Sequence, residues 1–159
     1  MTTDPTFTHL DDKGQARMVD VTNRDISVRT ATASGCVKLS STVVALLREG
    51  GIPKGDVLAT ARVAGILGAK RTPDLIPLCH PIALHAVDVK LEITDDGVSI
   101  RVSVKTADRT GVEMEALTAV SVAGLTVIDM VKALDPSASI CDVRVETKSG
   151  GRNGDWARD

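Results

Sequence analysis

The stretch HAVDVKLEITDDGVSIRVSVKT, residues 85–106, decides the fold. From 87 to 93 apolar residues alternate with charged ones, and from 98 to 104 they alternate with serine and arginine. The tetrapeptide TDDG at 94–97 lies between the two runs and is rich in turn residues. Because side chains two apart in a strand share a face, the pattern predicts an antiparallel hairpin with one buried face and one wet face.

Working outward from the hairpin, further segments carry strand or helix patterns. We expect strands over 16–21, 26–40 and 138–148. We expect helices over 43–50, 57–71 and 113–134. Apart from the weak first strand, the order along the chain is strand, helices, hairpin, helix, strand. That order predicts an α+β class, a ferredoxin-like β-α-β-β-α-β sandwich with an extra helix and an N-terminal strand.

Small residues mark one face of the helix expected over 57–71. Ala61, Ala64, Gly65 and Gly68 fall at helical spacing. Glycine costs about 1 kcal/mol in a helix relative to alanine, so its presence indicates a closely packed face. That face belongs either to a contact within the chain or to a subunit interface. The helix over 113–134 is apolar nearly all round, which favours deep burial or an interface.

The composition excludes several classes of protein. The chain has 159 residues, a net charge of −2, one Trp, one Phe and no Tyr. Without aromatic platforms or a basic surface, nucleic acid is not an expected partner. The sequence shows no apolar run of about 18 residues and no secretory signal pattern, so we expect no membrane association.

The chain is expected to form a single domain over 1–159, with residues 1–15 and 150–159 as flexible arms. Its three cysteines are Cys36, Cys79 and Cys141, and they are widely spaced. This spacing predicts no disulfide framework and favours a reducing, cytoplasmic location.

The first candidate site lies in LIPLCHPIAL, residues 75–84, where Cys79 and His80 stand between two prolines. Prolines favour extended backbone, in which adjacent side chains point to opposite faces. The two residues therefore do not form a nucleophile–base pair, and no spacing typical of a metal site accompanies them. Two interpretations remain open. His80 either offers a hydrogen bond to a ligand or caps a backbone carbonyl.

The second candidate is the pair Asp129 and Lys132, three residues apart on one face of an otherwise apolar helix. An ion pair is costly to bury, so its presence in such a helix favours a cleft and proton transfer near neutral pH. The alternative is a pair that orients the helix at an interface.

Further candidates surround these two. Glu113 and Glu115 begin the same helix, where acids either cap the helix or bind a donor group of a ligand. Lys54 in Pro-Lys-Gly and Lys148 before Ser-Gly-Gly lie beside glycine-rich backbone, which suits phosphate binding. The KSGG order is not that of a P-loop, and single surface lysines are most often only solvated.

Four stretches together resemble one known family. They are THLDDKGQARMVDV, KGDVLATARVAGILGAKRTPDLIPLCHP, RTGVEMEALTAVSVAGLTVIDMVKA and KSGGRNG. The chain is similar to the cyclic pyranopterin monophosphate synthase family of molybdenum cofactor biosynthesis, from about Thr8 to Gly154. One departure is Val131, where many members carry cysteine; it points away from the face of Asp129 and Lys132.

The resemblance implies a lyase that converts 3′,8-cyclo-7,8-dihydroguanosine 5′-triphosphate into cyclic pyranopterin monophosphate and pyrophosphate, without a cofactor or a metal. It implies a homohexamer, a trimer of dimers, with active sites at subunit interfaces. Asp129 is the implied catalytic acid/base, with Lys132 as its partner. The implied substrate-binding residues are Lys54, Leu78, Cys79, His80, Glu113, Met114, Glu115 and Lys148.

Two other functions compete with this one. The same fold could serve as a non-catalytic module that binds a small phosphorylated metabolite, or as a thiol- or metal-dependent enzyme centred on Cys79. One difficulty also stands against a site within one chain. At 1.5 Å per residue, Glu115 and Asp129 lie about 21 Å apart along their helix, which predicts a pocket shared between subunits.

Overall fold

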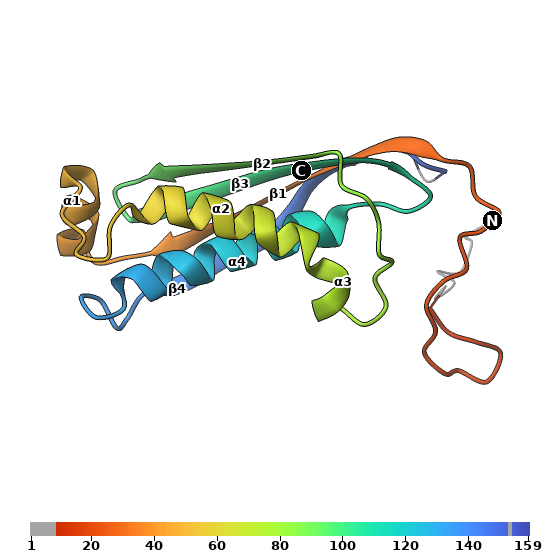
Figure 1. The fold of residues 1–159 in the computed structure, drawn as a ribbon, viewed down its shortest axis with the longest axis horizontal. Coiled ribbons are helices and arrows are strands. Elements are labelled where there is room, and N and C mark those ends of the chain that lie inside the picture. The colour runs from red at the N-terminus through yellow and green to blue at the C-terminus, as the bar shows by residue number, and fades with distance from the viewer. Residues whose placement is uncertain (1–8, 153) are drawn as a thin grey trace.

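The computed structural model describes residues 9–152 and 154–159, which form an antiparallel sheet covered on one face by helices (Figure 1). The strands, in spatial order, are β2 (Ala86–Ile93), β3 (Gly97–Asp108), β1 (Ser27–Lys38), β4 (Ser139–Ser149) and β5 (Trp156–Ala157). The helices are α1 (Ser41–Glu49), α2 (Val57–Lys70), α3 (Thr72–Leu75) and α4 (Glu113–Val131). The order β2-β3-β1-β4 confirms the predicted ferredoxin-like α+β fold.

The predicted hairpin is formed by β2 and β3. Val89 pairs with Val102, and both are buried against the helices, whereas Asp88 and Lys90 are exposed on the other face. Gly97 begins β3 with φ of 147°, and a Cβ there would lie 1.9 Å from the carbonyl oxygen of Val37. Only glycine fits at this position, because the hairpin turn lies directly against the backbone of strand β1.

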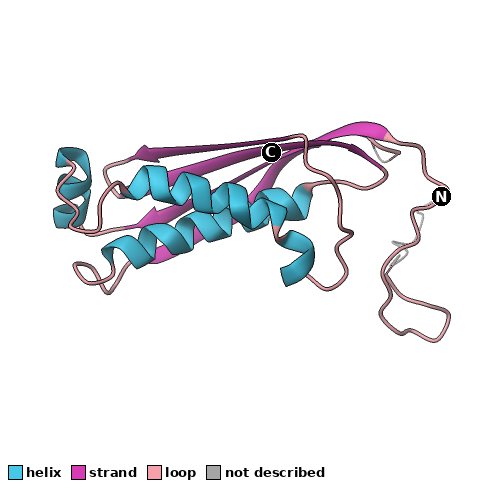
Figure 2. Cartoon of the chain, in the orientation of Figure 1, coloured by secondary structure: helices cyan, strands magenta, loops and turns pink. Residues whose placement is uncertain are grey.

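Helices α2 and α4 lie side by side on the sheet (Figure 2). A Cβ added at Gly65 would lie 3.1 Å from the carbonyl oxygen of Ala119, and one at Gly68 would lie 2.8 Å from Val122. The small-residue face of α2 therefore makes a tight contact within the chain. Of the two interpretations of these glycines, the structure supports this one.

Helix α4 is the core of the molecule. Nine of its residues are buried, among them Ala116, Ala119, Val120 and Val127, which are fully covered. By length and composition alone it would also be apolar enough to cross a membrane. Its burial against β1, β3, β4 and α2 is instead that of a central helix in a layered α+β fold.

Several segments differ from the sequence prediction. Among the described residues, the stretch from 16 to 21 makes a single bridge, from Ala16 to Leu10, and lies beside no strand of the sheet. Helix α4 ends at Val131 rather than 134. Short helix α3 was not expected, nor was β5, which pairs two residues of the expected C-terminal arm with β4. The part of the expected N-terminal arm over 1–8 lies outside the described residues.

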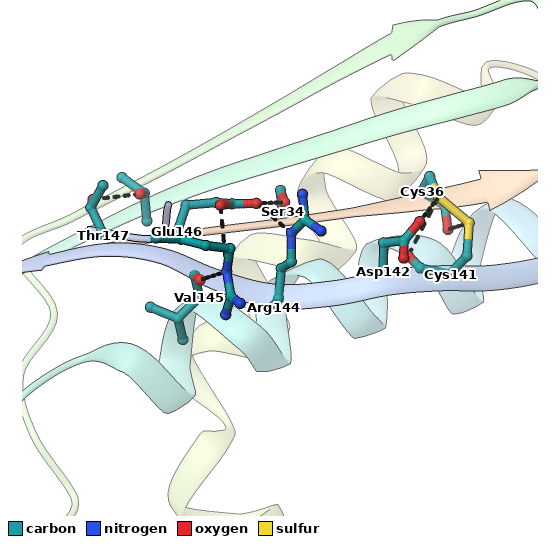
Figure 3. Close-up of polar contacts among 10 residues, drawn as sticks. Ser34, Cys36, Cys141, Asp142, Arg144, Val145, Glu146 and Thr147 are labelled. Carbon is teal, nitrogen blue, oxygen red and sulfur yellow. Dashed lines mark hydrogen bonds and ion pairs between the residues drawn. A yellow bond between two sulfur atoms is a disulfide. The ribbon is translucent and has the colours of Figure 1, made fainter. Parts of the chain in front are cut away.

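The prediction of no disulfide is wrong. Cys36 and Cys141 are joined by a disulfide between β1 and β4, with their Cα atoms 5.1 Å apart (Figure 3). They are 105 residues apart in sequence but face each other as partners in the strand register. Sequence spacing carries no information on such cross-strand neighbours, which is why the pair was missed.

Candidate functional site

The predicted site residues divide between the two ends of α4. At its N-terminal end, a cavity of about 190 Å³ is lined by side chains from the 78–80 loop, the start of α4 and the N-terminal segment. The predicted residues on its wall are Leu78, Cys79, His80, Glu113, Met114 and Glu115. The structure therefore brings these six together in one cavity.

Glu115 is the deepest charged group at this end. Only 3 % of its surface is exposed, because α4 begins against the sheet and turns this residue inward. Burial raises the pKa of Glu115 to about 7; a backbone hydrogen bond opposes this shift, and the nearby charge of Glu113 adds to it. At neutral pH the carboxyl is present in both protonation states, which suits proton donation and proton acceptance.

The Cys79-His80 loop meets this carboxyl. Burial, and secondarily the charge of Glu115, raises the pKa of the Cys79 thiol, so the thiol form is favoured. His80 donates from Nε2 to the carbonyl oxygen of Val19, 2.6 Å away, which fixes its tautomer. His80 thus caps a backbone carbonyl and also lines the cavity, so features of both interpretations are present.

A larger cavity, of about 700 Å³, adjoins the first and shares Arg24, Thr110, Gly111 and Glu113 with it. Its wall carries four cations and two carboxylates, namely Arg24, Arg29, Lys148, Arg152, Asp25 and Glu113. Lys148 Nζ lies 3.5 Å from Glu113 Oε1, which links the cationic cavity to the smaller one. The wall of this cavity therefore carries an excess of positive charge, which favours anions.

One further polar group lies in this region. The hydroxyl of Ser27 is buried and has no hydrogen-bond partner among the described residues, and Ser27 lines the larger cavity. The hydroxyl itself is covered, so the cavity wall at this position is formed by other atoms of Ser27.

At the C-terminal end of α4 the other predicted residues form a cluster of charges. Lys132 Nζ lies 2.7 Å from Asp129 Oδ1, and Lys54 Nζ lies 2.5 Å from the carbonyl oxygen and 3.3 Å from Oδ2 of the same residue. The Lys132 and Lys54 ammonium groups hold the pKa of Asp129 below its usual value. Both lysines stand where the last carbonyls of α4 and the helix dipole attract cations.

The prediction that Asp129 and Lys132 lie in a cleft is not met in the single chain. Their side chains are 59 % and 60 % exposed. The pair belongs to the last turn of α4 and the residue that follows it, where the helix end is open to solvent. An apolar helix does not bury its termini as it buries its middle, and sequence periodicity does not separate the two.

Sequence reasoning missed three cations of the larger cavity, namely Arg24, Arg29 and Arg152. Arg29 is held in place by a hydrogen bond from its Nε to the carbonyl oxygen of Asp108, 3.0 Å away. In the sequence these arginines resemble ordinary surface residues. The one available signal was that Arg152 follows the glycines beside Lys148.

Comparison with known proteins adds to this geometry. Residues 18–151 match the MoaC family. A protein of a Nocardioides species, 65 % identical over 96 % of this chain and 95 % of its own length, is named cyclic pyranopterin monophosphate synthase. A Streptomyces avermitilis protein of the same name is 66 % identical over 96 % of this chain and 89 % of its own. A Mycobacterium tuberculosis protein, cyclic pyranopterin monophosphate synthase 2, is 58 % identical over 96 % of this chain and 91 % of its own. On these matches, the chain belongs to the MoaC family.

Proposed function

We propose that this protein is a cyclic pyranopterin monophosphate synthase, a lyase of molybdenum cofactor biosynthesis. It converts 3′,8-cyclo-7,8-dihydroguanosine 5′-triphosphate into cyclic pyranopterin monophosphate with release of pyrophosphate. The observation that carries the proposal is the 64–66 % identity to proteins of that name over at least 95 % of the chain. The paired cavities at the start of α4 support it.

The larger cavity suits the triphosphate. Arg24, Arg29 and Arg152 present planar donors that match phosphate oxygens, and Lys148 adds a compact point charge. In this proposal Lys148 exchanges its contact with Glu113 for a phosphate oxygen when the substrate binds. Cations placed there also stabilise the charge that develops as pyrophosphate departs.

The smaller cavity suits the nucleobase-derived end. Glu115 accepts hydrogen bonds from ring N–H groups in its ionised form and returns a proton in its neutral form. Leu78, Cys79 and Met114 supply apolar wall, and Glu113 and the fixed imidazole of His80 complete the polar contacts. Substrate positioning is therefore assigned to this end of α4.

Proton transfer is assigned to Asp129, with Lys132 as its partner and Lys54 as a substrate contact. In the single chain the two lysines keep Asp129 ionised, which makes it a weak base. A substrate that draws Lys54 and Lys132 to its phosphates would leave the carboxylate less stabilised and more basic. The rearrangement and the cyclic phosphate closure then use proton shuttles and cations, with no cofactor.

This assignment requires more than one subunit. The two ends of α4 lie about 21 Å apart, too far for one small pocket. We therefore propose a cytoplasmic homohexamer, a trimer of dimers, in which the charge cluster of one chain faces the cavities of another. Exposed apolar side chains on the helical layer, Val63, Leu67 and Leu125, are available for such contacts.

Subunit mixing tests the shared site. Glu115→Ala removes a side chain of the cavity end, and Lys132→Ala removes a side chain of the charge cluster. Each variant alone is therefore expected to be inactive. If each site takes one end from each of two chains, random mixing restores about one quarter of the sites. Mixing two variants of the same end, Lys54→Ala and Lys132→Ala, is the matched control and restores far less. No recovery from the first mixture, despite demonstrated subunit exchange, would contradict a shared site.

The catalytic role of Asp129 is tested by Asp129→Asn. Release of pyrophosphate is expected to fall by about 10²–10⁴-fold, while affinity for the substrate stays within about tenfold, as for a group that acts in the transition state. The matched control is Asp95→Asn, an exposed aspartate in the hairpin turn whose ion pair with Arg48 lies away from both cavities.

The competing functions predict other outcomes. Wild-type protein that binds the substrate and releases no pyrophosphate is a binding module. Loss of activity in Cys79→Ser or on treatment with a chelator favours a thiol- or metal-dependent enzyme.

A further inference from the structure

The face of the sheet opposite the helices carries a group of residues that the proposed reaction does not use. Cys36 on β1 and Cys141 on β4 meet there as register partners, and Asp142 follows directly (Figure 3). Both cysteine residues are half-buried, whereas Asp142 is exposed. The group is therefore accessible from solvent.

The backbone of β4 is irregular at this place. Ser34 pairs with Arg144 and Cys36 pairs with Cys141, so β4 carries an extra residue between the two pairs. Within this bulge Asp142 has a φ of 54°, the one positive value among the described non-glycine residues. Aspartate is among the non-glycine residues that adopt this left-handed conformation most readily, so the bulge is compatible with its sequence.

The bulge changes where Asp142 points. In a regular strand, Asp142 and Cys141 would face opposite sides of the sheet. Here Asp142 Oδ2 lies 3.6 Å from Cys36 Sγ, so the carboxylate is on the same side as both sulfurs. One ligand atom from each of the three residues lies within 4.8 Å of the others.

Two thiolates and a carboxylate are the ligands of a thiophilic divalent cation such as Zn²⁺, with a fourth position for water. Arg144 donates from Nε to Glu146 Oε1 at 2.9 Å and acts on Asp142 only through the charge of its guanidinium group, without a direct ion pair. The sulfurs become ligands only when the disulfide is open. A small-molecule dithiol opens it by giving two electrons and two protons, so that the protein S–S bond breaks and the reductant becomes a disulfide.

We propose that Cys36, Cys141 and Asp142 form a redox-gated binding site for a thiophilic divalent cation. In the reduced protein the cation displaces two thiol protons and is held by both sulfurs and the carboxylate. In the oxidised protein the disulfide removes the two sulfur ligands. The site is independent of the proposed reaction, because none of its residues lines either cavity.

Zinc competition against a chromogenic chelator tests this site on the full-length protein, freed of reductant under anaerobic conditions. The reduced wild type is expected to bind one Zn²⁺ per chain, and the oxidised wild type to bind at least about 100-fold more weakly. This comparison uses one sequence, so a folding defect cannot mimic its result. Cobalt(II) in place of zinc is expected to show a thiolate charge-transfer band in the reduced protein only.

Substitutions then identify the ligands. Cys36→Ser and Cys141→Ser are expected to abolish tight binding, and Asp142→Asn to weaken it by about tenfold or more. Cys79→Ser, which removes the remaining cysteine, is the matched control and should bind as the wild type does. Equal affinity in the reduced and oxidised wild type, loss of binding in Cys79→Ser, or unchanged binding in Asp142→Asn would each overturn the proposal.

Discussion

The two ends of helix α4 carry carboxylates in opposite environments. Near the N-terminal end, Glu115 is almost fully buried, and burial raises its pKa to about 7. Near the C-terminal end, Asp129 is exposed, and two lysines lower its pKa. The surroundings, rather than the type of residue, decide which carboxylate can exchange a proton near neutral pH.

This contrast bears on the division of labour in the proposed reaction. The cavity end is lined by residues of one chain, and it holds a carboxyl whose pKa of about 7 suits proton exchange. The charge-cluster end is exposed in the single chain, and in the proposed assembly another subunit would cover it. A comparison of the pKa values of Glu115 and Asp129 in solution therefore tests whether each end of α4 has the environment that the structure gives it.

The largest effect on the free energy of unfolding is expected from Glu115→Gln. The pKa of Glu115 rises from 4.5 to about 7 on folding, so its contribution to stability is fully present below pH 4.5 and is lost as pH rises through 7. Above that range the wild type carries a penalty of about 3 kcal/mol that the glutamine variant lacks. Urea unfolding between pH 4 and 8 is expected to show the variant gaining stability over the wild type as pH rises.

The control for this prediction is Glu92→Gln, an exposed residue of β2, which should keep the wild-type pH dependence. A Glu115→Gln curve parallel to that of the wild type would show that Glu115 titrates as an ordinary surface acid. The contrast between the two ends of α4 would then disappear.

A smaller effect on the free energy of unfolding is expected from Gly68→Ala. The added Cβ would meet Val122 at 2.8 Å and push α2 away from α4, at a cost of about 1–3 kcal/mol in the free energy of unfolding. Lys70→Ala, an exposed position on the same helix, is the control. Equal urea midpoints for Gly68→Ala and the wild type would argue against the tight helix contact.

The smallest effect is expected from Asp129→Asn on stability. A carboxylate with a lowered pKa contributes stability above its usual value of 3.8, and that stability is lost only as pH falls through the lower folded value. Exposed ion pairs are also screened by solvent. The unfolding curves of the variant and the wild type should therefore change in parallel from pH 5 to 8. A pH-dependent difference in that range would show that Asp129 is buried in the assembled protein.

Local patterns predicted much of this molecule. The alternation in residues 85–106 predicted the hairpin, because its signal lies within one element. The grouping of Leu78, Cys79 and His80 with Glu113 and Glu115 followed only from the family resemblance. The structure places these five residues on one cavity wall because the fold brings the start of α4 beside the loop.

Contacts set by register and by helix ends were not predictable in this way. Cys36 meets Cys141 only because of the pairing of β1 with β4, and the re-aimed Asp142 depends on a bulge that leaves no sequence signal. The exposure of Asp129 depends on where α4 ends relative to the sheet. These features arise from long-range geometry, which a single sequence records weakly.

The last residues of the chain have a practical consequence for anyone preparing this protein. Trp156 pairs with Lys148, and Gly150 donates its N–H to Asp155 Oδ1, 3.0 Å away, so the C-terminus is folded back on the strand that delivers a cavity lysine. A purification handle fused after Asp159 would lie close to the wall of the larger cavity, to which Lys148 belongs. Assays of substrate affinity are therefore best made with an untagged C-terminus.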